Sequence, residues 1–286
     1  MRSGGVILAF MAAFAASTAF AAPLSPSRTD QSMAADAAAG PMVHPSLPVA
    51  APIADSVPIV LIPPVRTFSA SELENVALHV RNSLTGDLYD NFQLFLYVSK
   101  AESGPWAQHM FVLAKKPDGT LAVLQDWPVS TGRELNEANA AGTLLPSFTP
   151  EGYYQFDPAR MYTSHRSGQW GDEMPYAMFF NWTRDGRETG LAIHAATDDE
   201  VSLLGTRASA GCVRLSPQAA QDLFTLVQAQ YRGSAPVFEA YARNGATGNG
   251  GGLHFNADGS FQLADGYKVL VFIEDFSGEA SVASLR

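Results

Sequence analysis

Cysteine is the scarcest residue of this 286-residue chain, which contains only one, Cys212. A single cysteine cannot form an internal disulfide, and it cannot build a structural zinc site from Cys and His ligands. The six histidines show no paired spacing, so the sequence predicts neither a metal site nor a cofactor. Basic residues are also few. The net charge is −10, with no basic cluster, which argues against binding to nucleic acid or anionic membranes.

Long hydrophobic runs are absent as well, and none is long enough for a confident membrane span. The N-terminus carries a shorter run, in which Arg2 is followed by apolar residues from Val6 to Phe14. Small residues around Ala21 then provide a cleavage site, an order typical of secretory signals. The sequence therefore predicts a signal peptide at residues 1–21 and export without a remaining membrane span. An uncleaved anchor is the alternative.

Two further regions follow the signal. Residues 22–65 are rich in Ala, Pro and Ser without periodicity, which predicts a disordered or extended linker. The folded domain is expected at 66–286, starting with a helix that Ser69 and Glu72 begin as a capping box. A second helix is expected at 217–231, with Pro217 in its first turn.

Most remaining elements read as strands. The predicted strands span 92–98, 109–114, 121–127, 174–182, 190–194 and 267–273. The stretch 183–189 is expected to be a polar turn. An insertion at 233–265, with a glycine-rich tract at 244–252, precedes the last strand. It is either a mobile lid over a substrate or a surface insertion.

Cys212 and the upstream His194 are the candidate chemical groups. A lone cysteine is more often an inert small hydrophobe, and a lone histidine is usually structural. In an exported chain, however, an unpaired cysteine is a candidate reactive thiol. A thiol beside an imidazole is the arrangement that covalent acyl transfer requires. Gly211 allows close approach of a substrate and leaves backbone N–H groups to bind an oxyanion.

The same residues resemble the active-site signature of the L,D-transpeptidases, the YkuD-type catalytic domain. That signature is a histidine, a spacer of about fifteen residues, then Ser/Thr-His-Gly-Cys, a hydrophobic residue, and Arg or Asn. The matching residues are His194, Ser209, Gly211, Cys212, Val213 and Arg214. Upstream, 128–132 resembles the family's P-V-S-T-G element and 149–154 its T-P-x-G-x-F segment. The resemblance covers about 92–275.

The resemblance implies a β-rich α+β domain, a mixed sheet sandwich with few helices. The insertion at 233–265 before the last strand departs from the family pattern. It also implies a periplasmic enzyme acting on peptidoglycan stem peptides. Cys212 would attack a carbonyl of the donor stem, and His194 would serve as base, oriented by the backbone carbonyl of Ala195. Backbone N–H groups of Gly211 and Cys212 would hold the oxyanion. An amine of the acceptor stem would then resolve the acyl-enzyme.

Four residues are candidates for substrate binding. Arg214 either pairs with a stem carboxylate or pins its loop, and Ser209 is expected to hydrogen-bond the turn. Tyr176 is expected to face the substrate. His165 lines the same cleft or is a solvated loop residue. The acidic run 198–200 is expected to be a solvated loop, and the helix after Cys212 is expected to lower the thiol pKa.

Ala210 departs from the family pattern, because many members carry a second histidine there. This departure leaves two linkages open, the common 3,3-type cross-link and a 1,3-type link from L-alanine to diaminopimelate. Rival functions are a hydrolase on the same stems, with L,D-carboxypeptidase or endopeptidase activity, and a non-catalytic cell-wall binding module. A sortase is disfavoured, because its Thr-Leu-x-Thr-Cys strand is absent. The sequence makes no prediction of the oligomeric state.

Overall fold

The computed structural model describes residues 66–184, 187–242 and 252–279. The predicted signal peptide, the predicted linker and all but the last residue of the glycine-rich tract lie outside these residues. The described part of the chain is a β-rich α+β fold with several mixed sheets and few helices, which confirms the predicted fold class. None of the helices described in it is both long and apolar enough to cross a membrane.

Two short helices begin the fold. Helix α1 (Ala70–Ser83) begins at the predicted capping box, where the Ser69 hydroxyl accepts the Glu72 N–H and the Glu72 carboxylate accepts the Ser69 N–H. Helix α2 (Gly86–Asn91) was not predicted. Its N-cap, Thr85, accepts the Leu88 N–H. Both helices bury apolar side chains against the first sheet.

The first sheet has six strands in the order β16-β7-β18-β1-β2-β3. Its two central strands, β1 and β18, run parallel and are buried along their whole length, as expected for strands covered on both faces. β2 and β3 form the predicted antiparallel hairpin. The bounds are β1 Leu94–Ser99, β2 His109–Lys115, β3 Leu121–Pro128, β7 Gly152–Tyr154, β16 Tyr241–Ala242 and β18 Val269–Glu274.

The second sheet has four strands in the order β14-β12-β9-β8. β12 pairs antiparallel with β9 and parallel with β14. Helix α4 (Pro217–Gln230) follows β14, and its N-cap Ser216 accepts the Ala219 N–H. The strand bounds are β8 Phe156–Tyr162, β9 Ala177–Phe180, β12 Ala192–Ala195 and β14 Val213–Leu215.

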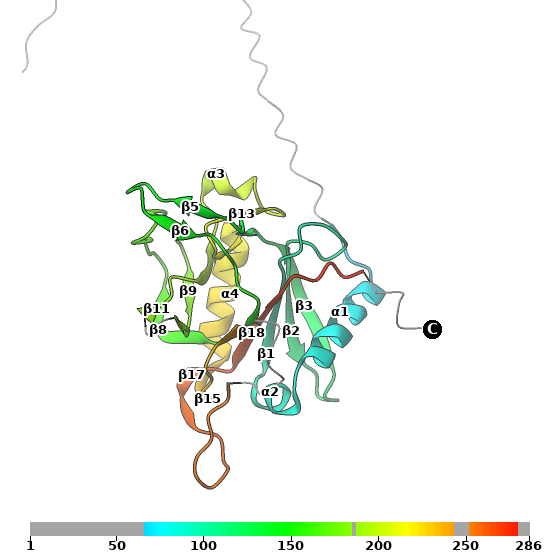
Figure 1. Ribbon diagram of the computed structural model, residues 1–286. Coiled ribbons are helices and arrows are strands. Elements are labelled where there is room, and N and C mark those ends of the chain that lie inside the picture. The colour runs from blue at the N-terminus through cyan, green and yellow to red at the C-terminus, as the bar shows by residue number, and fades with distance from the viewer. Residues whose placement is uncertain (1–65, 185–186, 243–251, 280–286) are drawn as a thin grey trace, which may run out of the picture. The chain divides into compact units, whose positions relative to one another are not determined.

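The first sheet separates two hydrophobic cores. Helices α1 and α2 cover one face, and α4 lies on the other face with the second sheet, as Figure 1 shows. Side chains alternate in direction along a strand, so β1 supplies Leu94, Leu96 and Val98 to one core and Phe95 and Tyr97 to the other. The α4 side carries the second sheet, whose outer face holds the candidate site.

The connections contain short paired strands and one more helix, α3 (Asp198–Val201). Two predictions were therefore wrong: 183–189 contains the hairpin of β10 and β11 and is not a plain turn, and 198–200 is helical. The paired strands are β4 Thr131–Gly132 with β13 Arg207–Ser209, β5 Asn136–Ala138 with β6 Leu144–Pro146, β10 Thr183–Arg184 with β11 Arg187–Glu188, and β15 Arg232–Pro236 with β17 Leu263–Tyr267.

Candidate active site

Strands β12 and β14 position the predicted nucleophile and base. They pair in parallel with His194 opposite Arg214. Ile193 and Val213, the preceding residue in each strand, are fully buried in the core beside α4. Because side chains alternate along a strand, His194 and Arg214 project from the opposite face. Cys212 directly precedes β14 and packs on this same outer face.

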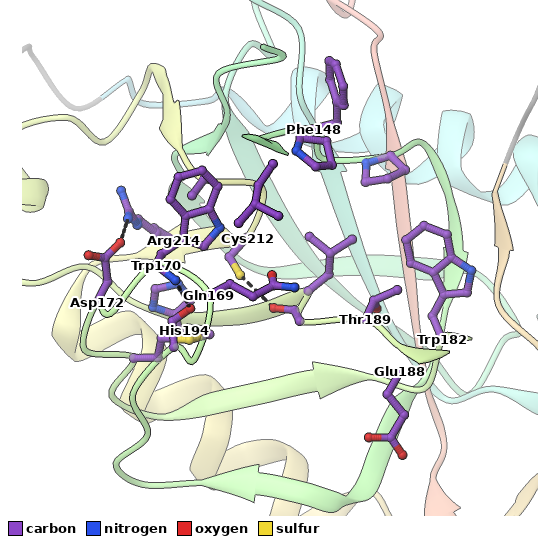
Figure 2. Close-up of a pocket in the computed structure, with 18 of the residues that line it drawn as sticks. Phe148, Gln169, Trp170, Asp172, Trp182, Glu188, Thr189, His194, Cys212 and Arg214 are labelled. Atoms are coloured by element: carbon purple, nitrogen blue, oxygen red, sulfur yellow. Dashed lines mark hydrogen bonds and ion pairs between the residues drawn. The ribbon is translucent and has the colours of Figure 1, made fainter. Parts of the chain in front are cut away.

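A cavity of about 450 Å³ opens on this face. We call His194, Cys212 and Arg214 the floor of this cavity. The fold therefore brings the predicted nucleophile and base into one cavity. Its rim consists of cavity-lining residues from three segments, at 145–150, 167–174 and 182–191. In Figure 2, Asp172 and Arg214 lie at one end of the cavity and Trp182 and Glu188 at the other, with Cys212 between.

The imidazole of His194 is oriented by the chain itself. Its Nδ1 lies 2.8 Å from the carbonyl oxygen of Ala195, as the resemblance implied. A proton on Nδ1 donates to that carbonyl, which leaves Nε2 as the proton acceptor. His194 is 2% exposed, and burial lowers its pKa to about 4. At neutral pH the imidazole is therefore uncharged and able to act as a base.

The thiol of Cys212 is also neutral at rest. Its Sγ donates to the carbonyl oxygen of Gly190 at 3.5 Å. Burial raises the thiol pKa to about 11, although the positive charge of Arg214 opposes this effect. The expectation that the following helix lowers this pKa was wrong. Helix α4 starts only at Pro217, beyond β14, and packs on the core face of the second sheet.

The turn before Cys212 is held by Ser209. This fully buried side chain donates to the Cys212 carbonyl at 2.5 Å and accepts the Gly211 N–H at 3.0 Å. Ser209 thus fixes the turn, as predicted, and has no surface to offer a substrate. The N–H groups of Gly211 and Cys212 were both expected to bind the oxyanion. The Gly211 N–H already donates to Ser209, so within the described ranges only the Cys212 N–H has no hydrogen-bond partner.

Gly211 cannot be replaced without strain. Its φ is +119°, and a Cβ there would lie 2.8 Å from the backbone oxygen of Phe148. Both the left-handed backbone and the close approach of the neighbouring chain require glycine. This is the physical reason for a glycine directly before the nucleophile.

Arg214 is a buried link between segments. It is 5% exposed, and its Nη2 lies 2.6 Å from Glu200 Oε1 and 3.6 Å from Asp172 Oδ2. These contacts fit the predicted pinning role, and the guanidinium also faces the cavity. They correct the expectation of a solvated acidic run, since the Glu200 side chain is only 17% exposed and also accepts the Thr197 N–H.

The other two candidate substrate contacts lie outside this cavity. Tyr176 packs its ring against Phe224 of α4, with ring centroids 5.8 Å apart, and does not line the cavity. His165 packs between Tyr162 and Phe179 and lines a neighbouring pocket of about 260 Å³. The two pockets share part of the wall between them, so His165 is near the site without facing Cys212.

The rim contains residues that the sequence analysis did not single out. Trp170 and Asp172 come from the loop between β8 and β9, and Trp182 and Glu188 from either side of the β10–β11 hairpin (Figure 2). A tryptophan within the polar stretch 164–173 was the one available signal, because large aromatic side chains in polar loops often serve binding.

The 233–265 insertion does not line the cavity in its described part. Phe238 and Leu253 are buried instead in the core beside α1 and α2. The segment 252–262, which precedes β17, lies at the same end of the domain as α2 in Figure 1. A lid over the substrate is therefore not its role in the residues described. The β5–β6 hairpin, in contrast, contributes Leu145 and Pro146 to the rim. It also contacts the 167–174 segment of the rim, because Asn139 Nδ2 donates to the Gln169 carbonyl at 2.7 Å.

The described residues contain no cluster of side chains suited to binding a metal ion. Within the described ranges, no three His, Cys, Asp or Glu residues are grouped so that they could hold a metal ion. What the arrangement offers is a thiol, a proton-accepting imidazole and a backbone N–H around one open cavity. These groups suit nucleophilic acyl transfer.

Solved structures that are similar to this chain include two L,D-transpeptidases and a cell shape determining protein. An L,D-transpeptidase from Xylanimonas cellulosilytica is 16% identical, with a TM-score of 0.34 and coverage of 64% of this chain and 61% of that chain. One from Mycobacterium smegmatis is 14% identical (TM-score 0.33, coverage 64% and 59%). The helical cell shape determining protein Pgp2 from Campylobacter jejuni is 14% identical (TM-score 0.34, coverage 65% and 49%).

The chain thus spans between about half and three fifths of the length of these structures. No curated protein matches its sequence significantly. A family model, the L,D-transpeptidase catalytic domain YkuD, matches residues 106–260, which is more than half of the chain and includes His194 and Cys212. This match shows that the chain belongs to the YkuD family of L,D-transpeptidase catalytic domains.

Proposed function

We propose that the protein is an exported peptidoglycan L,D-transpeptidase that joins stem peptides through a thioester on Cys212. The observation that carries the proposal is that Cys212 and His194 face one cavity, with the Ala195 carbonyl holding Nδ1 so that Nε2 accepts protons. The predicted signal peptide supports action in the periplasm. The hydrolase and the binding module remain the competing functions.

The first half-reaction starts from two neutral groups. Sγ of Cys212 attacks the carbonyl carbon of the donor peptide bond while its proton passes to Nε2 of His194. Proton transfer during the attack fits the Cys212 pKa of about 11 and the His194 pKa of about 4, because these values disfavour a resting thiolate–imidazolium pair. The oxyanion is stabilised by the Cys212 N–H. Its collapse breaks the C–N bond, and the leaving amine takes the proton from His194.

The second half-reaction transfers the acyl group. The amine of an acceptor stem attacks the thioester carbon and loses a proton to His194, and the departing sulfur then recovers that proton. The rim carries side chains of both charge signs: Arg187 is basic, and Asp172 and Glu188 are acidic. A zwitterionic peptide such as a stem ending in a diamino acid suits such a mixed lining.

The test is product analysis on purified sacculi incubated with wild type or with Cys212→Ala. We expect new dimeric muropeptides to appear with wild type only, and tandem mass spectra would assign the bond as 3,3-type or 1,3-type. Shortened stems or fewer dimers would instead identify a hydrolase. If wild type leaves the sacculi unchanged and a carbapenem forms no covalent adduct with it, the binding module replaces the enzyme.

A further inference from the structure

Thr149 lies directly behind the nucleophile turn. It is 1% exposed and does not line the cavity, although its neighbours Phe148 and Pro150 both do. Its hydroxyl donates to the carbonyl oxygen of Gly211 at 2.7 Å and accepts the N–H of Gly132 at 2.7 Å. A buried hydroxyl that both donates and accepts at this distance is fixed in orientation.

The bond to Gly211 controls the orientation of a neighbouring group. The Gly211 carbonyl and the Cys212 N–H belong to one planar peptide unit, and in a trans peptide they point in opposite directions. Anchoring the carbonyl on Thr149 therefore directs the N–H away from Thr149. That N–H is the one predicted oxyanion donor without a partner among the residues described.

Thr149 is itself held at both ends of its backbone. Its N–H donates to Glu134 Oε1 at 3.1 Å, and its carbonyl accepts from Lys100 Nζ at 2.8 Å. Lys100 and Glu134 form an ion pair at 2.9 Å, with the Lys100 side chain only 8% exposed. A buried ion pair that also binds the backbone resists displacement, because moving either partner leaves a charge uncompensated.

The backbone at Glu134 is a second sign that specific contacts hold this geometry. Glu134 has φ +59°, one of three positive values at non-glycine residues in the described chain. A non-glycine residue in the left-handed region is strained, and this conformation persists when the surrounding contacts hold it. Here those contacts are the bonds of its carboxylate to Thr149 and Lys100.

We propose that Thr149 is a positioning residue that orients the Gly211–Cys212 peptide so that the Cys212 N–H binds the oxyanion, with the Lys100–Glu134 pair holding Thr149. This inference rests on the proposed acyl transfer. It assigns Thr149 no contact with substrate. Its distinctive consequence is that Thr149 matters for reactions that form an oxyanion and not for other reactions of the same thiol.

Two probes of Cys212 separate these cases. Acylation by a carbapenem passes through a tetrahedral oxyanion, whereas alkylation by iodoacetamide displaces iodide and forms none. Thr149→Val keeps the shape and removes the hydroxyl. We expect its acylation rate constant to fall about 10- to 100-fold, somewhat less than for removal of an oxyanion donor, and its alkylation rate to stay within about twofold. Thr149→Ser should restore acylation to within about threefold of wild type.

Equal acylation by Thr149→Val and wild type would overturn the inference, and so would a parallel fall in acylation and alkylation. If valine prevents folding, Glu134→Gln provides the second variant, because it weakens a charge-assisted contact to Thr149 and Lys100. We expect a fall of about three- to tenfold in acylation only, and no fall overturns the inference. Absence of any wild-type adduct would contradict the proposed function itself, and the role of Thr149 would fall with it.

Discussion

The floor and the rim of the cavity are built by different means. His194 and Arg214 on the floor are 2% and 5% exposed and stand on strands whose opposite faces are fully buried. On the rim, Phe148 is 36% exposed and the Glu188 side chain 66%. Groups proposed to react need fixed geometry, which strands of the packed sheet and the turn directly before β14 provide, whereas loops can vary to suit a substrate. Mutations on the floor should therefore change the acylation rate and the stability, whereas mutations on the rim should mainly change KM.

The largest effect should come from the base on the floor. His194→Gln is similar in size but cannot accept a proton, so we expect carbapenem acylation at pH 7 to fall about 10²- to 10⁴-fold. Rapid-mixing mass spectrometry of the adduct measures it. Because the thiol pKa is about 11, iodoacetamide alkylation of variant and wild type should converge as pH approaches 11. A persistent gap there would mean that His194 supports the fold and not proton transfer.

The same substitution should change the acid sensitivity of the protein. Burial lowers the pKa of His194 from 6.5 to about 4, so as pH falls the unfolded chain takes up this proton before the folded one. The contribution of this group to stability is complete above pH 6.5 and is lost as pH falls through 4. Urea unfolding between pH 7 and 4 should show a steeper decline for wild type than for His194→Gln.

A smaller effect is expected from breaking an ion pair, either that of Arg214 on the floor or that of Arg166 in the loop that carries part of the rim. Arg214→Gln leaves the Glu200 carboxylate without its closest cation, and breaking a buried pair costs about 3–5 kcal/mol of unfolding free energy. The matched control is Arg166→Gln in the loop that carries the rim, where Arg166 and Glu173 are 69% and 51% exposed. That pair should contribute less than about 1 kcal/mol. Similar losses in urea unfolding would contradict the comparison.

The smallest effect should come from the link between the β5–β6 hairpin and the 167–174 segment of the rim. Asn139→Asp keeps the oxygen that accepts the N–H groups of Ala141 and Thr143 but loses the donor to Gln169. We expect a rise of about two- to fivefold in KM for stem peptides with kcat within twofold, and a stability change of about 1 kcal/mol or less. Asn256→Asp, in a loop that does not line the cavity, should leave both constants unchanged.

Much of the fold could be predicted because its signals are local. The capping box at Ser69 and the β2–β3 hairpin follow from neighbouring residues, and both appear in the structure. Helix α2 was missed because it has only 6 residues, too few to show a helical period. The role of Phe238 was missed for another reason, since its partners in the core come from distant parts of the chain.

The sequence by itself identified the candidate reacting groups: one cysteine, a histidine 18 residues earlier and the glycine that the turn requires, because each depends on residue type and spacing along the chain. Only the tertiary structure decided that the thiol and imidazole are both neutral at rest, since their pKa values depend on burial. It also decided that Arg214 pairs with Glu200 and that Thr149 holds the nucleophile turn. Such contacts join segments that no local pattern connects.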